Sequence, residues 1–344
     1  MDASNANPEV QTAAPAAAGC WQFDRQQAEA VLREAVHAPL TELGVIAASG
    51  DDAARFLHGQ LTNDVEHLAA DRLALAGYCT AKGRLLSTFR LWRDERGVCL
   101  LLPRELLPGV LKRLSMFVLR AKAKLVDDSA AWHVSAVFGR TAEAKLRALG
   151  IAVPAAPGDC VRDGATRIAR LPGSPRVPER FLVLAPAAQA GQVASRLAEL
   201  HTVGSGAFWW SEIDAGVPTV FAATQEKFVP QMINFEVIGG VSFSKGCYPG
   251  QEVVARSQYR GKLRRRMQLA HCAAAAPAGA DVFAEGDAEA AGTVVMAAAA
   301  PGGGFDLLFE CPQEKAEAPL RLGAANGPAL ELRPMPYELV DVTA

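Results

Sequence analysis

The segment best suited to chemistry is Lys245-Gly-Cys-Tyr-Pro-Gly-Gln-Glu252, which continues into Val253-Val-Ala-Arg256. A glycine on each side of Cys247 permits tight backbone turns. Lys245 and Arg256 place positive charge nearby, and positive charge favours the thiolate, which is the nucleophilic and metal-binding form of cysteine. On chemistry alone, a glycine-rich turn with a passive cysteine and a structural salt bridge explains the segment equally well.

The remaining cysteines and the histidines show no spacing typical of a metal site. No two of the 7 cysteines form a CxxC pair, and none of the 6 histidines stands four residues from a cysteine or another histidine. The odd number of cysteines argues against a disulfide framework. We therefore expect no metal site, and we expect most of the cysteines to be small buried hydrophobic residues.

The composition indicates an ordinary globular protein. The chain has 344 residues, 50% of them hydrophobic, which suits two or three domains. Its formal net charge of −2 provides no global field to attract nucleic acid or an anionic membrane. No long apolar stretch lacks charges or turn residues, so no membrane span is expected. Residues 1–19 lack the features of a secretory or mitochondrial leader, and we expect a disordered tail on a cytoplasmic protein.

Hydrophobic periodicity predicts the elements that must position these residues. We expect a helix from 24 to about 36, a strand at 43–48, paired strands at 73–79 and 85–92, and two strand–helix units at 134–149 and 181–200. The segment 154–178 is rich in proline, glycine and charge, which predicts an exposed loop. Short apolar runs at 281–283, 292–296, 305–309 and 329–332 predict a small all-β C-terminal domain.

Further motifs follow one another along the chain: Gly59-Gln-Leu-Thr-Asn-Asp-Val65, Cys79-Thr-Ala-Lys-Gly-Arg84, Ile213-Asp-Ala-Gly-Val-Pro218, Pro230-Gln-Met-Ile-Asn234 and Tyr259-Arg-Gly261. With the cysteine segment, they resemble the motifs of the YgfZ/GcvT-like folate-binding family. The matches run in the family's order from about residue 40 to the C-terminus, so the resemblance covers nearly the whole chain.

The resemblance implies an α+β fold, namely a three-lobed ring of two interleaved α+β domains with a small C-terminal β-barrel. It divides the chain into a tail (1–19), a first domain (20–70 and 130–225), a second domain (71–129 and 226–265) and the barrel (266–344). It also implies that tetrahydrofolate or a related folate binds at the central opening. The implied role is accessory: assembly, repair or activity of iron–sulfur enzymes such as a radical tRNA-thiolation enzyme, without independent turnover.

The resemblance also assigns candidate site residues. Asp214 lies where related aminomethyltransferases hold the pterin, and a carboxylate can accept two parallel hydrogen bonds from an aminopyrimidine edge. Trp209 is expected to stack on the pterin or on the aminobenzoyl ring. Cys247 is the expected functional thiol, supported electrostatically by Lys245 and Arg256. The other expected folate contacts are Asn63, Asp64, Lys82, Tyr248, Gln251 and Glu252. Turn capping is the alternative for Asn63 and Asp214, and an ordinary exposed turn is the alternative for Lys82.

Two other functions fit less well. An aminomethyltransferase of the glycine cleavage type would need a carboxylate on the strand after the glycine hairpin, where this chain has Ser87 and Thr88. A hydroxyl group is not an anion at neutral pH and cannot take over that task. The basic cluster Arg260-Gly-Lys-Leu-Arg-Arg-Arg266 could contact RNA phosphates, but no aromatic beyond Tyr259 accompanies it. We therefore expect weak or no direct RNA binding.

Overall fold

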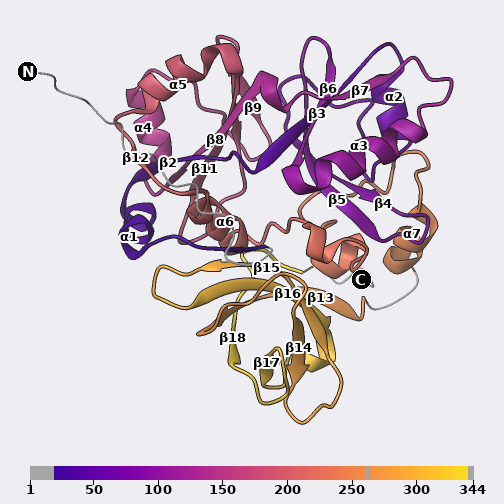
Figure 1. The fold of residues 1–344 in the computed structure, drawn as a ribbon, viewed down its shortest axis with the longest axis vertical. Helices are drawn as coiled ribbons and strands as arrows, with labels where there is room; N and C mark the ends of the chain where they lie inside the picture. Colours follow the sequence, from indigo (N-terminus) through magenta and orange to yellow (C-terminus); the bar gives the residue numbers. More distant parts are fainter. Residues whose placement is uncertain (1–18, 260–262, 340–344) are drawn as a thin grey trace, which may run out of the picture.

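The computed structural model describes residues 19–259 and 263–339. Two open sheets and a closed barrel form three lobes that surround the middle of the molecule (Figure 1). This arrangement confirms the α+β class and the C-terminal barrel. Among the described residues, no helix combines the length and the apolar character needed to cross a membrane.

The first lobe is a six-stranded sheet in the order β12, β2, β8, β11, β10, β9. Its strands are β2 (Ala35–Pro39), β8 (Trp132–Gly139), β9 (Cys160–Asp163), β10 (Thr166–Arg170), β11 (Glu179–Pro186) and β12 (His201–Thr202). Helices α1 (Arg25–Arg33), α4 (Ala142–Ala148) and α5 (Ala190–Leu197) pack against this sheet. The central strands β8 and β11 are nearly continuous apolar runs because helices and a neighbouring lobe cover them.

The second lobe is a five-stranded sheet in the order β4, β5, β6, β3, β7. Its strands are β3 (Leu43–Ser49), β4 (Ala74–Cys79), β5 (Leu85–Arg93), β6 (Gly97–Pro103) and β7 (Lys124–Asp127). Helices α2 (Ala53–His58) and α3 (Leu107–Met116) belong to this lobe, and α3 packs on β3 and β7. Helix α7 (Gln251–Tyr259) lies beside the β4–β5 hairpin (Figure 1).

The third lobe is a barrel in which β16 pairs with both β13 and β15 and thereby closes the sheet. Its strands are β13 (Arg265–Cys272), β14 (Asp281–Ala284), β15 (Gly292–Ala299), β16 (Phe305–Pro312), β17 (Leu320–Leu322) and β18 (Ala329–Arg333). Strand β1 (Cys20–Trp21) pairs in parallel with β15. Short 3₁₀ turns complete the fold: η1 (Arg104–Leu106), η2 (Ser129–Ala131), η3 (Ala187–Gln189), η4 (Ala222–Thr224), η5 (Pro230–Ile233) and η6 (Gln313–Lys315).

Helix α6 (Ser205–Asp214) contacts all three lobes, because its Glu212 also pairs with Arg90 on β5 of the second lobe. Every residue of this helix is buried, and it packs on β1, β15 and β16 of the barrel side and on β2 of the first lobe. A helix that is buried on all sides must be surrounded by protein, and here Phe208, Trp209 and Trp210 are its largest side chains.

Three sequence-based expectations need correction. The helix predicted to reach residue 36 ends at Arg33, because Glu34 is extended and the following residues enter the first sheet as β2. The predicted loop 154–178 contains the hairpin formed by β9 and β10. The boundary predicted near residue 70 lies instead between β2 and β3, because β3 pairs with β6 and β7 of the second lobe. The predicted tail lies outside the described residues up to residue 18.

Candidate functional site

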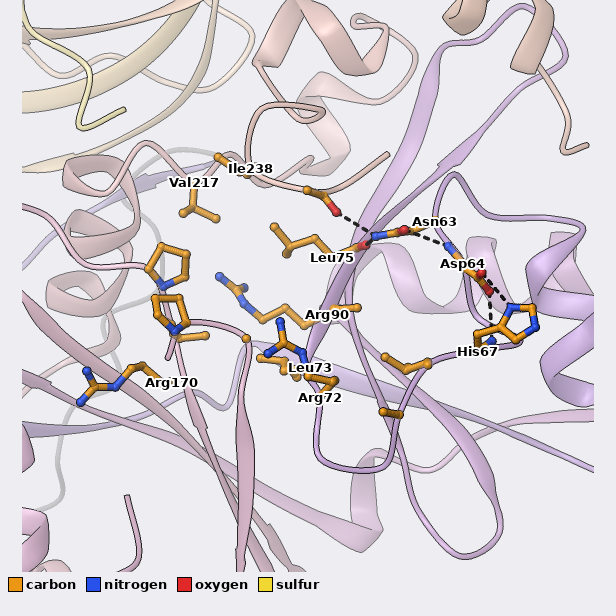
Figure 2. Close-up of a pocket in the computed structure, with 18 residues that line it drawn as sticks. Asn63, Asp64, His67, Arg72, Leu73, Leu75, Arg90, Arg170, Val217 and Ile238 are labelled. Atoms are coloured by element: carbon orange, nitrogen blue, oxygen red, sulfur yellow. Dashed lines mark hydrogen bonds and ion pairs between the residues drawn. The ribbon is translucent and has the colours of Figure 1, made fainter. Parts of the chain in front are cut away.

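A pocket of about 440 Å³ lies where the first two lobes meet (Figure 2). The second lobe contributes β4, β5 and the loop before β4, and the first lobe contributes the segments on either side of the β9–β10 hairpin. Apolar side chains of Leu73, Leu75, Val217 and Ile238 form part of its wall. Its polar side chains are Asn63, Asp64, His67, Arg72, Arg90 and Arg170.

Asn63 both lines the pocket and holds its wall together. Its Nδ2 donates to the carbonyl of Leu75 at 2.7 Å and to that of Gly239 at 2.8 Å (Figure 2). Its Oδ1 accepts a hydrogen bond of 2.8 Å from the backbone N–H of Asp64. The pocket-lining position and the turn-stabilising role, which the sequence left as alternatives, therefore occur together.

Asp64 is the acid that faces this pocket, and two histidines hold it. Its carboxylate lies 3.0 Å from Nδ1 of His58 and 2.9 Å from Nδ1 of His67, and it accepts from the backbone N–H of His67 at 3.0 Å. Partial burial acts to raise the pKa of Asp64, but the hydrogen bonds from His67 and the charges of both histidines lower the pKa to about 2. Asp64 is therefore an anion at neutral pH.

Three arginines make the pocket predominantly cationic. Arg72 pairs with Asp159, Arg170 pairs with Glu143, and Arg90 pairs with Glu212 behind the pocket wall. Each guanidinium has several N–H donors in a fixed planar fork, so pairing with one carboxylate leaves donors for a second acceptor. Figure 2 shows the guanidinium groups of Arg72 and Arg90 close together, whereas the side chain of Arg170 points away from them.

The Glu212 carboxylate fixes Arg90 from a fully buried position. Arg90 and Arg180 both pair with it, and neither Glu212 nor Arg180 has exposed side-chain surface. Burial acts to raise the pKa of Glu212, but the charges of the two arginines and their hydrogen bonds outweigh it, so the pKa is lowered. Arg90 is thus a preorganised cation at the pocket.

The loop that carries Cys247 lies on the other side of the Asp64 segment. Cys247 is exposed, whereas the other six cysteines are buried. Lys245 is buried, and its Nζ donates to the carbonyls of His58 and Leu61 and lies 5.0 Å from the centre of the Tyr248 ring. Burial lowers the pKa of Lys245 to about 8, although the charges of Asp64 and of a Cys247 thiolate act in the opposite direction.

The β4–β5 hairpin tip contacts this cysteine loop. A Cβ on Gly250 would lie 2.4 Å from the carbonyl oxygen of Thr80 and 2.7 Å from the Cα of Gly83, so the two backbones touch where only glycine fits. Lys82 is exposed on the tip. The remaining predicted residues of this region are the exposed Glu252 and Arg256, the half-buried Gln251 and the buried Tyr248.

The structure therefore divides the predicted site into two neighbouring groups. Asn63 and Asp64 line the pocket, whereas the residues of the cysteine loop, helix α7 and the hairpin tip do not. The segment from His58 to Asp64 connects the groups, because Lys245 binds its backbone. Among the described residues, no three His, Cys, Asp or Glu side chains converge as metal ligands.

Two predicted folate contacts do not fit this arrangement. Asp214 is buried, and its carboxylate is already bound to Ser174 and to Arg176, which also pairs with Asp306. Trp209 has no exposed surface: its ring stacks on Trp21 at 5.1 Å, and other aromatic rings cover the rest. Neither residue lines the pocket between the lobes, so a folate bound there would not contact them, and the two contacts stay predictions.

Sequence reasoning missed the pocket arginines and His67. Arg90 could have been noticed, because it interrupts the apolar strand Leu85–Arg93 and is itself buried. A charge in such a strand needs a partner, and it often serves a site. Arg72 and Arg170 give no comparable signal, since they lie in polar segments whose approach depends on the packing of two lobes.

Comparison with known proteins adds the family. No family model matches the chain. Among curated proteins, the tRNA-modifying protein YgfZ of Serratia proteamaculans is 35% identical over 239 residues, which cover 67% of this chain and 71% of that protein. The YgfZ of Edwardsiella ictaluri is 35% identical over 239 residues, and that of Escherichia coli O139:H28 is 32% identical over 231 residues. These matches cover 68% and 67% of this chain and 71% and 70% of the relatives.

A solved structure shares the fold. Aminomethyltransferase T of the glycine cleavage system from Bartonella henselae superposes with a TM-score of 0.74 at 16% identity, over 90% of this chain and 88% of that one. The three lobes thus define a protein of the aminomethyltransferase T fold. Within that class, the chain belongs to the family of the tRNA-modifying protein YgfZ.

Proposed function

We propose that this protein binds a folate in the pocket between the first two lobes and acts as an accessory protein for iron–sulfur enzymes, including enzymes that modify tRNA. The observation that carries the folate part is the pocket itself, whose lining combines arginine side chains with apolar ones. Membership of the YgfZ family and the aminomethyltransferase T fold support the choice of ligand and of pathway.

The residues of the pocket fit such a ligand. Its volume of about 440 Å³ is typical of small-molecule sites, which span roughly 300–1,000 Å³. Arg72 and Arg90 would bind the carboxylates of the folate glutamate, because guanidinium groups pair strongly with carboxylates. Leu75 and Ile238 would contact the ring systems. The pterin would be held without Asp214, whose carboxylate is bound to Ser174 and Arg176.

Aminomethyl transfer is less well supported. Ser87 and Thr88, which stand at the carboxylate positions of the transferases, are buried, and Oγ1 of Thr88 accepts a hydrogen bond of 3.2 Å from the backbone of Val220. Direct RNA binding through the basic cluster also has little support. Arg265 pairs with Glu310 and Arg266 pairs with Glu236, while residues 260–262 lie outside the described residues.

The cysteine loop supports the accessory role. Cys247 is exposed, and Lys245 ties its loop to the pocket segment, so folate binding and thiol chemistry are physically connected. One cysteine cannot hold a [4Fe–4S] cluster within a single chain, since such clusters take four ligands. The thiol would therefore act on the cluster of a client protein or on the client's own cysteines.

The folate proposal is tested by calorimetric titration of the purified protein with tetrahydrofolate. Ile238→Trp should block the pocket, and Arg72→Gln should weaken binding by about tenfold because a charge-assisted hydrogen bond is lost. The matched controls are Leu332→Trp, at an exposed apolar position on the barrel, and Arg162→Gln. Arg72 and Arg162 are matched because their side chains are 47% and 49% exposed and each has one ion pair. Absence of binding to the unaltered protein, or full binding by Ile238→Trp, would contradict the proposal.

A further inference from the structure

A second surface, far along the chain from the pocket residues, has the features of a docking site. Most exposed large apolar side chains of the described residues gather in one short segment of the second lobe: Met116 is 66% exposed, Phe117 46%, Leu119 86% and Val126 36%. Met116 is the last residue of α3, Phe117 and Leu119 follow it, and Val126 lies on β7, against which α3 packs. We call these four residues the apolar edge.

The backbone at this surface is unusual. Leu119 adopts a positive φ of 47°, a left-handed conformation that a bulky side chain rarely takes. The segment is nevertheless well anchored, because the backbone N–H of Lys122 donates to Asp52 at 2.8 Å. The chain therefore holds a strained leucine in water, which costs stability and exposes apolar surface at the same time.

Most charges on the segment that carries the apolar edge are positive. The segment 112–124 carries Lys112, Arg113, Arg120, Lys122 and Lys124 and has no acidic residue, in a chain whose net charge is −2. The acid on β7, Asp127, accepts hydrogen bonds from Ser129. Lys122 has a nearby partner in Asp51 at 3.7 Å, but that carboxylate is itself highly exposed. An anionic partner would therefore be attracted to this side of the molecule.

The surface also includes the free edge of a sheet. Strand β7 pairs with β3 and is the last strand of the five-stranded sheet. Its residues are mostly exposed. An edge strand presents unpaired N–H and C=O groups that an added strand can satisfy.

We propose that the apolar edge and β7 bind an extended, acidic and apolar segment of a partner protein, which adds to the sheet beside β7. Charge complementarity selects the acidic partner, and the apolar edge supplies the contact area. A single aromatic, Phe117, offers little of the base stacking by which single-stranded RNA is held. A lipid surface cannot satisfy the backbone groups of the strand edge, whereas a peptide strand can. The proposal does not depend on folate binding.

The test uses fluorescence anisotropy with a labelled peptide of alternating glutamate and valine as the probe. Bulk tRNA, anionic phospholipid vesicles and an alternating lysine–valine peptide are measured in parallel. We expect the acidic peptide to bind, with weaker binding at high salt. Met116→Ser combined with Leu119→Ser, and separately Lys112→Glu combined with Arg120→Glu, should each weaken binding at least tenfold. The control Leu332→Ser should leave it unchanged.

The strand-addition geometry has its own readout. Methylation of alternate backbone nitrogens of the acidic peptide removes the donors for one edge, so binding should be lost while charge and apolar content stay the same. The proposal is overturned if the acidic peptide does not bind, if the patch variants bind it normally, or if N-methylation has no effect. Patch-dependent binding of tRNA or vesicles without peptide binding would also overturn it, and would assign the surface to that other ligand.

Discussion

The Nζ atom of Lys245 donates a hydrogen bond of 2.7 Å to the carbonyl oxygen of Leu61. This bond joins the loop of the exposed thiol to the segment that enters the pocket two residues later. A second bond from the same Nζ to the carbonyl of His58 strengthens the link. Lys245 is therefore better described as a tether between two functional segments than as a simple source of positive charge for Cys247.

Replacement of this tether should destabilise the protein. Lys245→Met keeps the aliphatic stem but leaves the buried carbonyl of Leu61 without its donor, and we expect a loss of roughly 1–3 kcal/mol in the free energy of unfolding. Urea denaturation at pH 7 measures it. Lys82→Met, at an exposed position, is the control and should change little. Equal stability of the two variants would show that the tether is unimportant.

The contact between the hairpin tip and the cysteine loop predicts a steric effect. Gly250 and Gly150 both have positive φ, 83° and 67°, but a Cβ would clash only at Gly250, since nothing lies within 4 Å of the corresponding point at Gly150. Gly250→Ala should therefore cost about 1–3 kcal/mol more than Gly150→Ala, because the hairpin and the loop must separate. Thermal unfolding of both variants gives the comparison. Similar losses would mean that backbone strain, rather than contact, decides the effect.

Asp64 predicts a particular dependence of stability on pH. Its pKa is about 2 in the folded protein, below the ordinary value of about 3.9 for an unfolded chain. A lowered pKa contributes stability that is present above pH 4 and is lost as the pH falls through 2. Asp64→Asn should therefore be less stable than the unaltered protein at pH 6, and the difference should disappear towards pH 2. A difference that is constant over this range would contradict the assignment.

Two carboxylates test how burial changes the contribution of an ion pair to the free energy of unfolding. Glu212 and Glu143 each pair with two arginines, and each holds one pocket arginine. Glu212 has no exposed side-chain surface, whereas Glu143 is 28% exposed. Glu212→Gln should cost roughly 3–5 kcal/mol, because it leaves buried arginines without a counter-charge. Glu143→Gln should cost about 1 kcal/mol or less. Chemical denaturation that ranks them in the opposite order would refute this explanation.

The exposure of Cys247 predicts selective reactivity. In the folded protein, one cysteine should react rapidly with a thiol reagent, because the other six are buried. After unfolding, all seven cysteines should react.

In cells, Cys247→Ala should lower the activity of a [4Fe–4S] client enzyme and the content of thiolated nucleosides in tRNA. Ser244→Ala, which alters an exposed residue of the same loop, is the control. Normal client activity at normal protein levels would count against a role for the thiol.

The sequence predicted the local features well and the long-range pairs poorly. The cysteine loop, the Asn63–Asp64 turn and most strands are local patterns, and the structure contains them at the expected places. The carboxylate of Asp214 binds Arg176, which lies 38 positions earlier in the chain and is brought close by the tertiary fold. Likewise, Arg90 and Glu212 are separated by 122 positions, so no motif could have shown that they form a pair.

The three aromatic residues of α6 show what an apolar run in the sequence can and cannot predict. Consecutive residues on a helix point about 100° apart, so Phe208, Trp209 and Trp210 cannot all be buried against one neighbour. Their common burial shows that α6 is surrounded, and the apolar run in the sequence was consistent with that. The expectation that one of these rings faces a ligand came from the family resemblance, whereas in the structure Trp209 stacks on Trp21.

The pairing of β1 with β15 has a mechanical consequence. Gly19 and Cys20 are held against a strand of the C-terminal barrel, through pairs such as Cys20 with Ala297 and a hydrogen bond of 3.0 Å from Ala297 to Gly19. A stretching force applied between the start of β1 and the end of β18 would therefore be carried by the short β1–β15 pairing and by the barrel. The two sheet lobes lie between these points in the sequence, but they would bear load only after β1 had separated from β15.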